Sequence, residues 1–262
     1  MIKMVTLDEV KEIGQLKARE HLLQYARDCP YAGHVLRKIS PYFTKFFVNH
    51  GVSANQISSF SIMLGIAANL TFVFGNYYLM LVGCFLFQWW NLFDLADGET
   101  ARVTNVKTSG GKYLETINEP ITECGFTACL GIGLSKILAN KVFIFWGLIF
   151  GLFISLLSSF ARTRDMMTER FQTPKKTYTN PIKTSFAKRS YKKARLLFVV
   201  ANGYLILTVI VIFELLFQGQ LSFTFLGCNL NLMSVYFLLY GFIWIVRTII
   251  SSITNYRKLM RS

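Results

Sequence analysis

Four carboxylates are spaced so that two neighbouring helices would bring them together. Asp94 and Asp97 are three residues apart, and Glu115 and Glu119 are four apart, so each pair lies on one face of its helix. The short polar segment 104–111 (TNVKTSGG) would let the two helix ends meet. Like charges at this density would take up protons unless a cation lay between them. Oxygen ligands in this number favour Mg²⁺, Mn²⁺ or Ca²⁺ over zinc, and two ions bridged by shared carboxylates are the simplest arrangement.

The residues around these acids fit chemistry on phosphate groups. A pair of metal ions stabilises both the attacking and the leaving oxygen of a phosphoryl displacement. Gly98 leaves room for a ligand beside the backbone, and Arg102 offers several N–H donors to phosphate oxygens. A structural salt-bridge cluster is the alternative, but only Arg102, Lys107 and Lys112 stand near the four acids.

The elements that carry these residues are apolar enough for a membrane. The chain has 262 residues, of which 53% are hydrophobic and only 16% charged, where a soluble domain carries about 25%. Its mean hydropathy is +0.40. The predicted fold is therefore an all-α polytopic membrane protein with six transmembrane helices. The predicted spans are 54–74, 78–97, 110–133, 141–161, 195–217 and 231–253.

The distribution of basic residues predicts the orientation. Among the Lys and Arg residues, only Lys136 and Lys141 fall on one side of the predicted spans. The positive-inside rule then places both termini, the acidic turn and the loop 162–195 in the cytoplasm. Basic loops beside anionic lipid account for the net charge of +14, so no nucleic-acid partner is expected. Residues 1–50 are expected to form a cytoplasmic segment with an amphipathic helix, which opens with a capping box from Thr6 to Glu9.

Residues 94–119 resemble the signature of the CDP-alcohol phosphatidyltransferase family, D-x-x-D-G-x-x-A-R-x8-G-x3-D-x3-D. Glu115 and Glu119 stand where the family has its last two aspartates, and the segment 53–58 (SANQIS) resembles the family's P-N-x-[IV]-T motif. The spacing is kept throughout, and the identical positions are Asp94, Asp97, Gly98, Ala101, Arg102 and Gly111.

The resemblance implies an enzyme. The family transfers a phospho-alcohol or phosphatidyl group from a CDP-linked donor to an acceptor hydroxyl and releases CMP. By this resemblance Asp94, Asp97, Glu115 and Glu119 would hold two Mg²⁺ ions (or Mn²⁺), and Glu119 would also be the general base. The implied nucleotide-binding residues are Asn55, Gln56, Ile57, Ser58, Gly98, Arg102 and Thr108.

Several expectations depend on less specific patterns. The membrane domain is expected to span 51–255, with a cytoplasmic tail at 256–262. Four basic residues could bind an acceptor phosphate, although topological charge is the favoured explanation for any single one of them: Arg162, Arg164, Lys188 and Arg189. Gly147 and Gly151 form a GxxxG motif that could seat a helix partner, and the family resemblance implies a homodimer.

Two other functions stay open at this point. A non-catalytic membrane scaffold descended from the same family would explain the two glutamates in place of aspartates. A cation transporter would also place carboxylates in membrane helices, but it would have them near the middle of the membrane and in repeat-related pairs. The acceptor, a lipid or a small alcohol, is not specified by the sequence.

Overall fold

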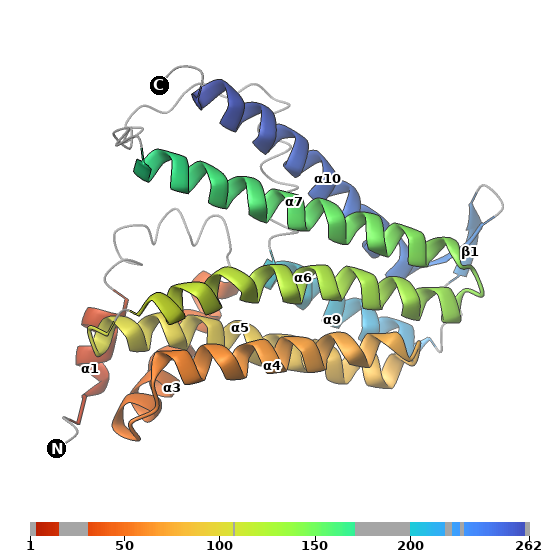
Figure 1. Ribbon diagram of the computed structural model, residues 1–262. Coiled ribbons are helices and arrows are strands. Elements are labelled where there is room, and N and C mark those ends of the chain that lie inside the picture. Colours follow the sequence, from red (N-terminus) through yellow and green to blue (C-terminus); the bar gives the residue numbers. More distant parts are fainter. Residues whose placement is uncertain are drawn as a thin grey trace.

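The computed structural model describes residues 4–15, 31–106, 108–170, 200–217, 222–225 and 228–259. In these residues the chain is mainly helical, with one small hairpin late in the sequence (Figure 1). The long helices are α4 (Ala54–Val73), α5 (Tyr77–Val103), α6 (Ser109–Ile137), α7 (Val142–Arg170), α9 (Val200–Leu216) and α10 (Leu232–Leu259).

The long helices form a bundle with its chemistry-bearing residues at one end. Helix α4 packs against both α5 and α6, α5 also contacts α9, and α7 packs between α6 and α10 (Figure 1). The connection from α5 to α6 lies at the same end of the bundle as α1 and the last turns of α10, and the hairpin lies at the opposite end (Figure 1). The acidic end of α5 therefore shares one face of the molecule with the described N-terminal segment.

Within the part of the chain that the structure describes, four helices are long and apolar enough to cross a membrane, which identifies an integral membrane protein. Their apolar segments are Ala54–Val73, Tyr77–Val103, Val142–Phe160 and Leu232–Thr254. The predicted count of six is confirmed only in part. Helix α6 has the length but carries polar and charged side chains along it, and the apolar part of α9, Gly203–Leu216, is shorter than a span.

A short hairpin adds two strands to the helical architecture, which otherwise agrees with the all-α prediction. Strand β1 (Ser222–Phe225) pairs antiparallel with β2 (Cys228–Asn231) and joins α9 to α10. The last helix begins at Leu232 because Asn231 caps it: its Oδ1 accepts a hydrogen bond of 2.8 Å from the Ser234 N–H. The predicted final span, which started at 231, therefore began one residue early.

The N-terminal segment is described in two parts. The first holds α1 (Leu7–Glu9) and a π-helical turn, η1 (Val10–Gly14); the second holds η2 (Ala32–Leu36) and α3 (Arg37–Asn49). The predicted capping box is confirmed, since Thr6 Oγ1 accepts from the Glu9 N–H and Glu9 Oε2 accepts from the Thr6 N–H. Both η1 and α3 pack against α5, so this segment lies on the protein beside the acidic residues.

An aromatic cluster in the middle of the bundle fixes the helices relative to one another. Phe87 of α5 stacks on Tyr204 of α9 with ring centroids 4.0 Å apart, and Phe126 of α6 meets both rings edge-on. Phe72 of α4 and Tyr240 of α10 extend the cluster. All five side chains are buried, so the cluster sets the distance between α5 and α6 that the site requires.

The predicted GxxxG motif packs inside the chain. A Cβ added to Gly147 of α7 would lie 2.6 Å from the carbonyl oxygen of Thr127 in α6, and one on Gly131 would lie 2.5 Å from that of Phe143. Helices α6 and α7 thus meet backbone to backbone, as small residues allow. The helix partner of the motif is α6 of the same chain, and the homodimer stays a prediction without support from this surface.

Candidate active site

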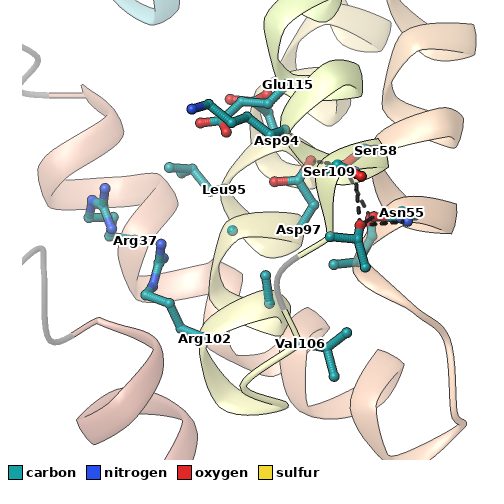
Figure 2. Close-up of a pocket in the computed structure, with 16 residues that line it drawn as sticks. Arg37, Asn55, Ser58, Asp94, Leu95, Asp97, Arg102, Val106, Ser109 and Glu115 are labelled. Carbon is teal, nitrogen blue, oxygen red and sulfur yellow. Dashed lines mark hydrogen bonds between the residues drawn. The ribbon is translucent and has the colours of Figure 1, made fainter. Parts of the chain in front are cut away.

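The signature residues whose side chains the structure describes line one pocket of about 670 Å³ at the end of the bundle (Figure 2). Helices α3, α4, α5 and α6 and the connection from α5 to α6 all contribute to it. Its lining residues are Arg37, Ala54, Asn55, Ser58, Asp94, Leu95, Asp97, Gly98, Ala101, Arg102, Val106, Thr108, Ser109, Gly111, Lys112 and Glu115.

The pocket exists because α5 and α6 are joined by a tight connection. Helix α5 ends at Val103 with Thr104 as its C-cap, and Asn105 turns the chain with a φ of 53°. Thr108 then caps α6, since its Oγ1 accepts a hydrogen bond of 2.9 Å from the Gly111 N–H. At 27 residues α5 is about 40 Å long, so its last turns extend beyond about 30 Å of hydrocarbon. The acids can therefore lie near the membrane surface.

Neutral donors from neighbouring helices orient two of the carboxylates. Asn118 of α6 donates from Nδ2 to Oδ1 of Asp94 over 2.9 Å, and Ser58 of α4 donates from Oγ to Oδ2 of Asp97 over 2.5 Å. Glu115 lies on the same face of α6 as Asn118, and its side chain is exposed to the pocket (Figure 2). Hydrogen bonds to Asp94 and Asp97 of α5 thus connect this helix to both α4 and α6.

Asn118 is itself held by two buried groups. Its Oδ1 accepts a hydrogen bond of 2.9 Å from Nε1 of Trp90, and its Nδ2 also lies 3.3 Å from Oγ of Ser61. Trp90 and Asn118 are both almost completely buried. The amide is therefore fixed with its nitrogen towards Asp94, because the indole N–H can only donate.

Gly98 and Arg102 are adjacent, one helical turn apart. A Cβ added to Gly98 would lie 3.3 Å from a terminal guanidinium nitrogen of Arg102, so the arginine side chain runs back along the helix over the glycine. Nε of Arg102 donates to the backbone carbonyl of Gly14 over 2.5 Å. The N-terminal segment therefore holds Arg102 in the pocket.

A second polar group lies on another wall, around Asn55. The side chain of Asn55 is 3.1 Å from Oγ1 of Thr108, and a Cβ added to Gly111 would be only 2.7 Å from Oδ1 of Asn55. A Cβ on Gly110 would come no closer than 3.8 Å to Asn55. The signature glycine is required here because α4 and the first turn of α6 meet without space for a side chain.

A buried acid attaches the N-terminal segment to α5. Glu99 is fully buried, and its carboxylate accepts hydrogen bonds from Ser40 Oγ (2.7 Å) and Thr44 Oγ1 (2.9 Å) of α3. Gln15 Nε2 lies 3.4 Å from the same carboxylate and donates over 2.6 Å to the carbonyl of Arg37. Glu99 occupies a variable position of the signature, so its contacts serve the attachment of α3 to α5.

Most of the predicted site residues that can be located come together. Asn55, Ser58, Gly98, Arg102 and Thr108 all line the pocket. Gln56 and Ile57 do not: Gln56 completes a capping box with Ser53, and Ile57 is buried in the protein. The side chains of Glu119, Arg162 and Arg164 fall outside what the structure describes, as do Lys188 and Arg189 altogether.

The donor chemistry of the pocket suits a hard divalent cation, although the described side chains do not form a closed metal centre. Asp94, Asp97 and Glu115 supply carboxylate oxygens to one space. Among the described residues, no three His, Cys, Asp or Glu side chains are grouped closely enough to hold an ion. The backbone of α6 places Glu119 one turn after Glu115. Glu119 would therefore supply a fourth carboxylate from the same helix as Glu115.

Two residues of the site were missed by sequence reasoning. Asn118 carries no motif signal, although its position three residues after Glu115 puts it on the same helix face. Arg37 lies far upstream and had been counted only among the basic residues that set the orientation. Its contribution to the pocket depends on the packing of α3 against α5, which composition and spacing do not specify.

Comparison with known families agrees with this geometry. The family model for CDP-alcohol phosphatidyltransferase matches residues 51–225, more than half of the chain. The protein therefore belongs to the CDP-alcohol phosphatidyltransferase family, whose members transfer a phosphatidyl group from a CDP-alcohol. No curated protein matches the chain significantly.

Proposed function

We propose that the protein is a metal-dependent CDP-alcohol phosphotransferase. It would move a phospho-alcohol or phosphatidyl group from a CDP-linked donor to an acceptor hydroxyl, with release of CMP. The observation that carries this proposal is that the signature residues from Asp94 to Glu115, together with Asn55 and Ser58 of α4, line a single pocket. The hydrogen bonds that orient Asp94 and Asp97 add support for a retained site.

The roles of the residues follow from their place in the pocket. Asp94, Asp97, Glu115 and Glu119 would hold the ions, which supply positive charge to the pyrophosphate and to departing CMP. The wall formed by Asn55, Thr108 and Gly111, with Gly98 and Arg102, would bind the CDP part of the donor. Arg102 suits a phosphate because its guanidinium can donate two parallel hydrogen bonds.

In the proposed reaction Glu119 accepts the proton of the acceptor hydroxyl. The acceptor oxygen then bonds to the phosphorus that carries the donor alcohol, and the bond from this phosphorus to the bridging oxygen of CMP breaks. The electron pair of that bond leaves with CMP. Charge on the departing phosphate is stabilised by donors already fixed in the pocket, which lowers the barrier more than mobile water would.

The proposal includes the orientation in the membrane. Both termini, the α5–α6 connection and the pocket would face the cytoplasm, with six crossings in all. The arrangement of α1, the end of α10 and the α5–α6 connection at one end of the bundle supports an even number of crossings. Cysteine labelling from outside intact cells, in a background without native cysteines, should miss residues 104 and 105; efficient labelling there would contradict the orientation.

The reaction itself can be tested without knowing the substrates. Purified protein with Mg²⁺ should be offered a panel of CDP-linked donors with a lipid extract, and the products should be identified by mass. The proposal predicts a new phosphodiester together with CMP for at least one donor. If every donor is returned intact, the scaffold interpretation replaces the enzyme.

A further inference from the structure

We propose that Arg37 is a second phosphate-binding arginine, which forms a paired anion site with Arg102. Arg37 is the first residue of α3 and lies outside residues 51–225, which the family model covers. It nevertheless lines the same pocket as Arg102. Figure 2 shows both side chains on one side of the pocket, Asn55 on the opposite side, and the acids Asp94, Asp97 and Glu115 between them.

The backbone of Arg37 is fixed by contacts on both sides. Leu36 before it is buried and packs with Ala32 and Leu95. The carbonyl of Arg37 accepts the 2.6 Å hydrogen bond from Gln15, and α3 is held to α5 through Glu99. Because its backbone is fixed, the Arg37 side chain loses less conformational entropy when it binds a ligand. Its contacts therefore contribute more to the binding free energy.

Two guanidinium groups lie close together in the pocket. Arg37 and Arg102 are near enough for their like charges to interact, while Glu99, Asp97 and Glu115 act on Arg102 with the opposite sign. Lys112 adds a third cation to the lining. Nε of Arg37 is shielded from solvent, unlike a basic residue that serves only to set membrane orientation. A phosphate group carries several oxygens that a pair of guanidinium groups can each bind through two hydrogen bonds.

The position of Arg37 relative to the wall that would bind the nucleotide (Asn55, Thr108 and Gly111) limits which molecule can carry the bound phosphate. The inference rests on the proposed function, in which the nucleotide lies against Asn55, Thr108 and Gly111. Arg37 faces the pocket from the other side, so a phosphate there belongs to the pyrophosphate of the donor or to an acceptor that itself carries a phosphate. Both sources present the same oxyanion.

The test measures binding rather than turnover. Full-length protein with Mg²⁺ is titrated with CDP, with CMP, and with inorganic phosphate both alone and in the presence of CMP. The variants are Arg37→Gln and Arg37→Lys, with Lys38→Gln as the matched control. Lys38 is the exposed neighbour on the same helix, does not line the pocket, and loses the same charge.

If Arg37 binds the donor pyrophosphate, Arg37→Gln should lower the affinity for CDP by about tenfold or more and the affinity for CMP much less. If Arg37 binds an acceptor phosphate, the affinity for CDP should stay unchanged and the affinity for inorganic phosphate should fall by about tenfold or more. Arg37→Lys should lower the affinity for the same ligand by a smaller factor, because lysine keeps the positive charge but lacks the planar set of guanidinium donors. This variant also tests the site if Arg37→Gln does not fold. Lys38→Gln should match the wild type.

Wild-type affinity of Arg37→Gln for all three ligands, in folded protein, would overturn the paired site. This outcome is distinct from failure of the proposed function, which would show as wild-type protein that binds no CDP at all. In that case the titration with inorganic phosphate alone decides whether the two arginines bind an anion.

Discussion

Asn118 donates a 2.9 Å hydrogen bond to Asp94, and the same amide accepts one of 2.9 Å from the buried indole of Trp90. A residue of α6 thereby orients the first acid of the signature on α5. The direction of the amide is set by Trp90, which can only donate. The position of Asp94 is thus determined by helix packing as much as by its own helix.

Removal of this amide should affect both fold and chemistry. In Asn118→Ala the Trp90 N–H is left buried without its acceptor, which costs about 1–3 kcal/mol in free energy of unfolding. Asp94 also loses its donor, so the apparent affinity for Mg²⁺ and the rate of CMP release should fall together. Asn91→Ala is the control, because buried Asn91 donates to the Phe87 carbonyl of its own helix and makes no side-chain hydrogen bond to another described helix. Equal activity of the two variants would show that Asn118 does not orient Asp94.

The two neighbouring glycines of α6 give a matched pair. Gly111→Ala places a Cβ 2.7 Å from Asn55 Oδ1, whereas Gly110→Ala meets nothing closer than 3.8 Å. Both changes favour helix formation by up to about 1 kcal/mol. We therefore expect Gly111→Ala to weaken CDP binding by about tenfold (about 1.4 kcal/mol) and Gly110→Ala to leave it unchanged. Calorimetric titration measures the CDP affinity of both variants. A larger loss of affinity in Gly110→Ala than in Gly111→Ala would refute the assignment of Asn55, Thr108 and Gly111 to nucleotide binding.

Glu99 should control how firmly the N-terminal segment is attached. Glu99→Ala leaves the hydroxyls of Ser40 and Thr44 buried without their acceptor, at about 1–3 kcal/mol for each. We expect limited proteolysis to cut within residues 1–50 faster than in the wild type, while the bundle resists. Exposed Glu12→Gln is the control. An unchanged cleavage rate in Glu99→Ala would mean that other contacts hold the segment.

The last acid of the signature should behave as a base. Glu119→Gln removes proton acceptance, so the rate should fall by about 10²–10⁴-fold while CDP binding stays close to the wild type. Glu119→Asp should also be impaired, since a shorter side chain on the same backbone no longer reaches the acceptor. Glu115→Gln should instead lower metal affinity and turnover together. Wild-type CMP release from Glu119→Gln would assign the base to another residue.

Local patterns were enough to predict the long helices and the residues that the signature brings together. The spacing of Asp94, Asp97 and Glu115 predicted a common site because helix periodicity fixes which side chains share a face. The capping box at Thr6 and the link between α5 and α6 are equally local. The resemblance proposed Asn55 and Ser58 as nucleotide-binding residues; both line the pocket, and nucleotide binding itself stays a prediction.

Features that depend on contacts between distant segments could not be predicted in this way. Arg37 enters the pocket only because Glu99, a variable residue of the signature, binds α3. Asn118 directs its amide nitrogen to Asp94 because Trp90, on another helix, donates to its oxygen. The hairpin before α10 is formed by four-residue strands that pair with each other, which is too short a pattern to distinguish from a loop.

The central claim is most directly tested by metal-dependent release of CMP in the purified protein. The account predicts that, with a CDP-linked donor and acceptor lipid, wild-type protein releases CMP with Mg²⁺ and stops when EDTA removes the metal. Asp97→Asn should lose most of this activity and remain folded, because an asparagine can still accept the hydrogen bond from Ser58. Release that continues in EDTA, or an Asp97→Asn variant as active as the wild type, would contradict the account.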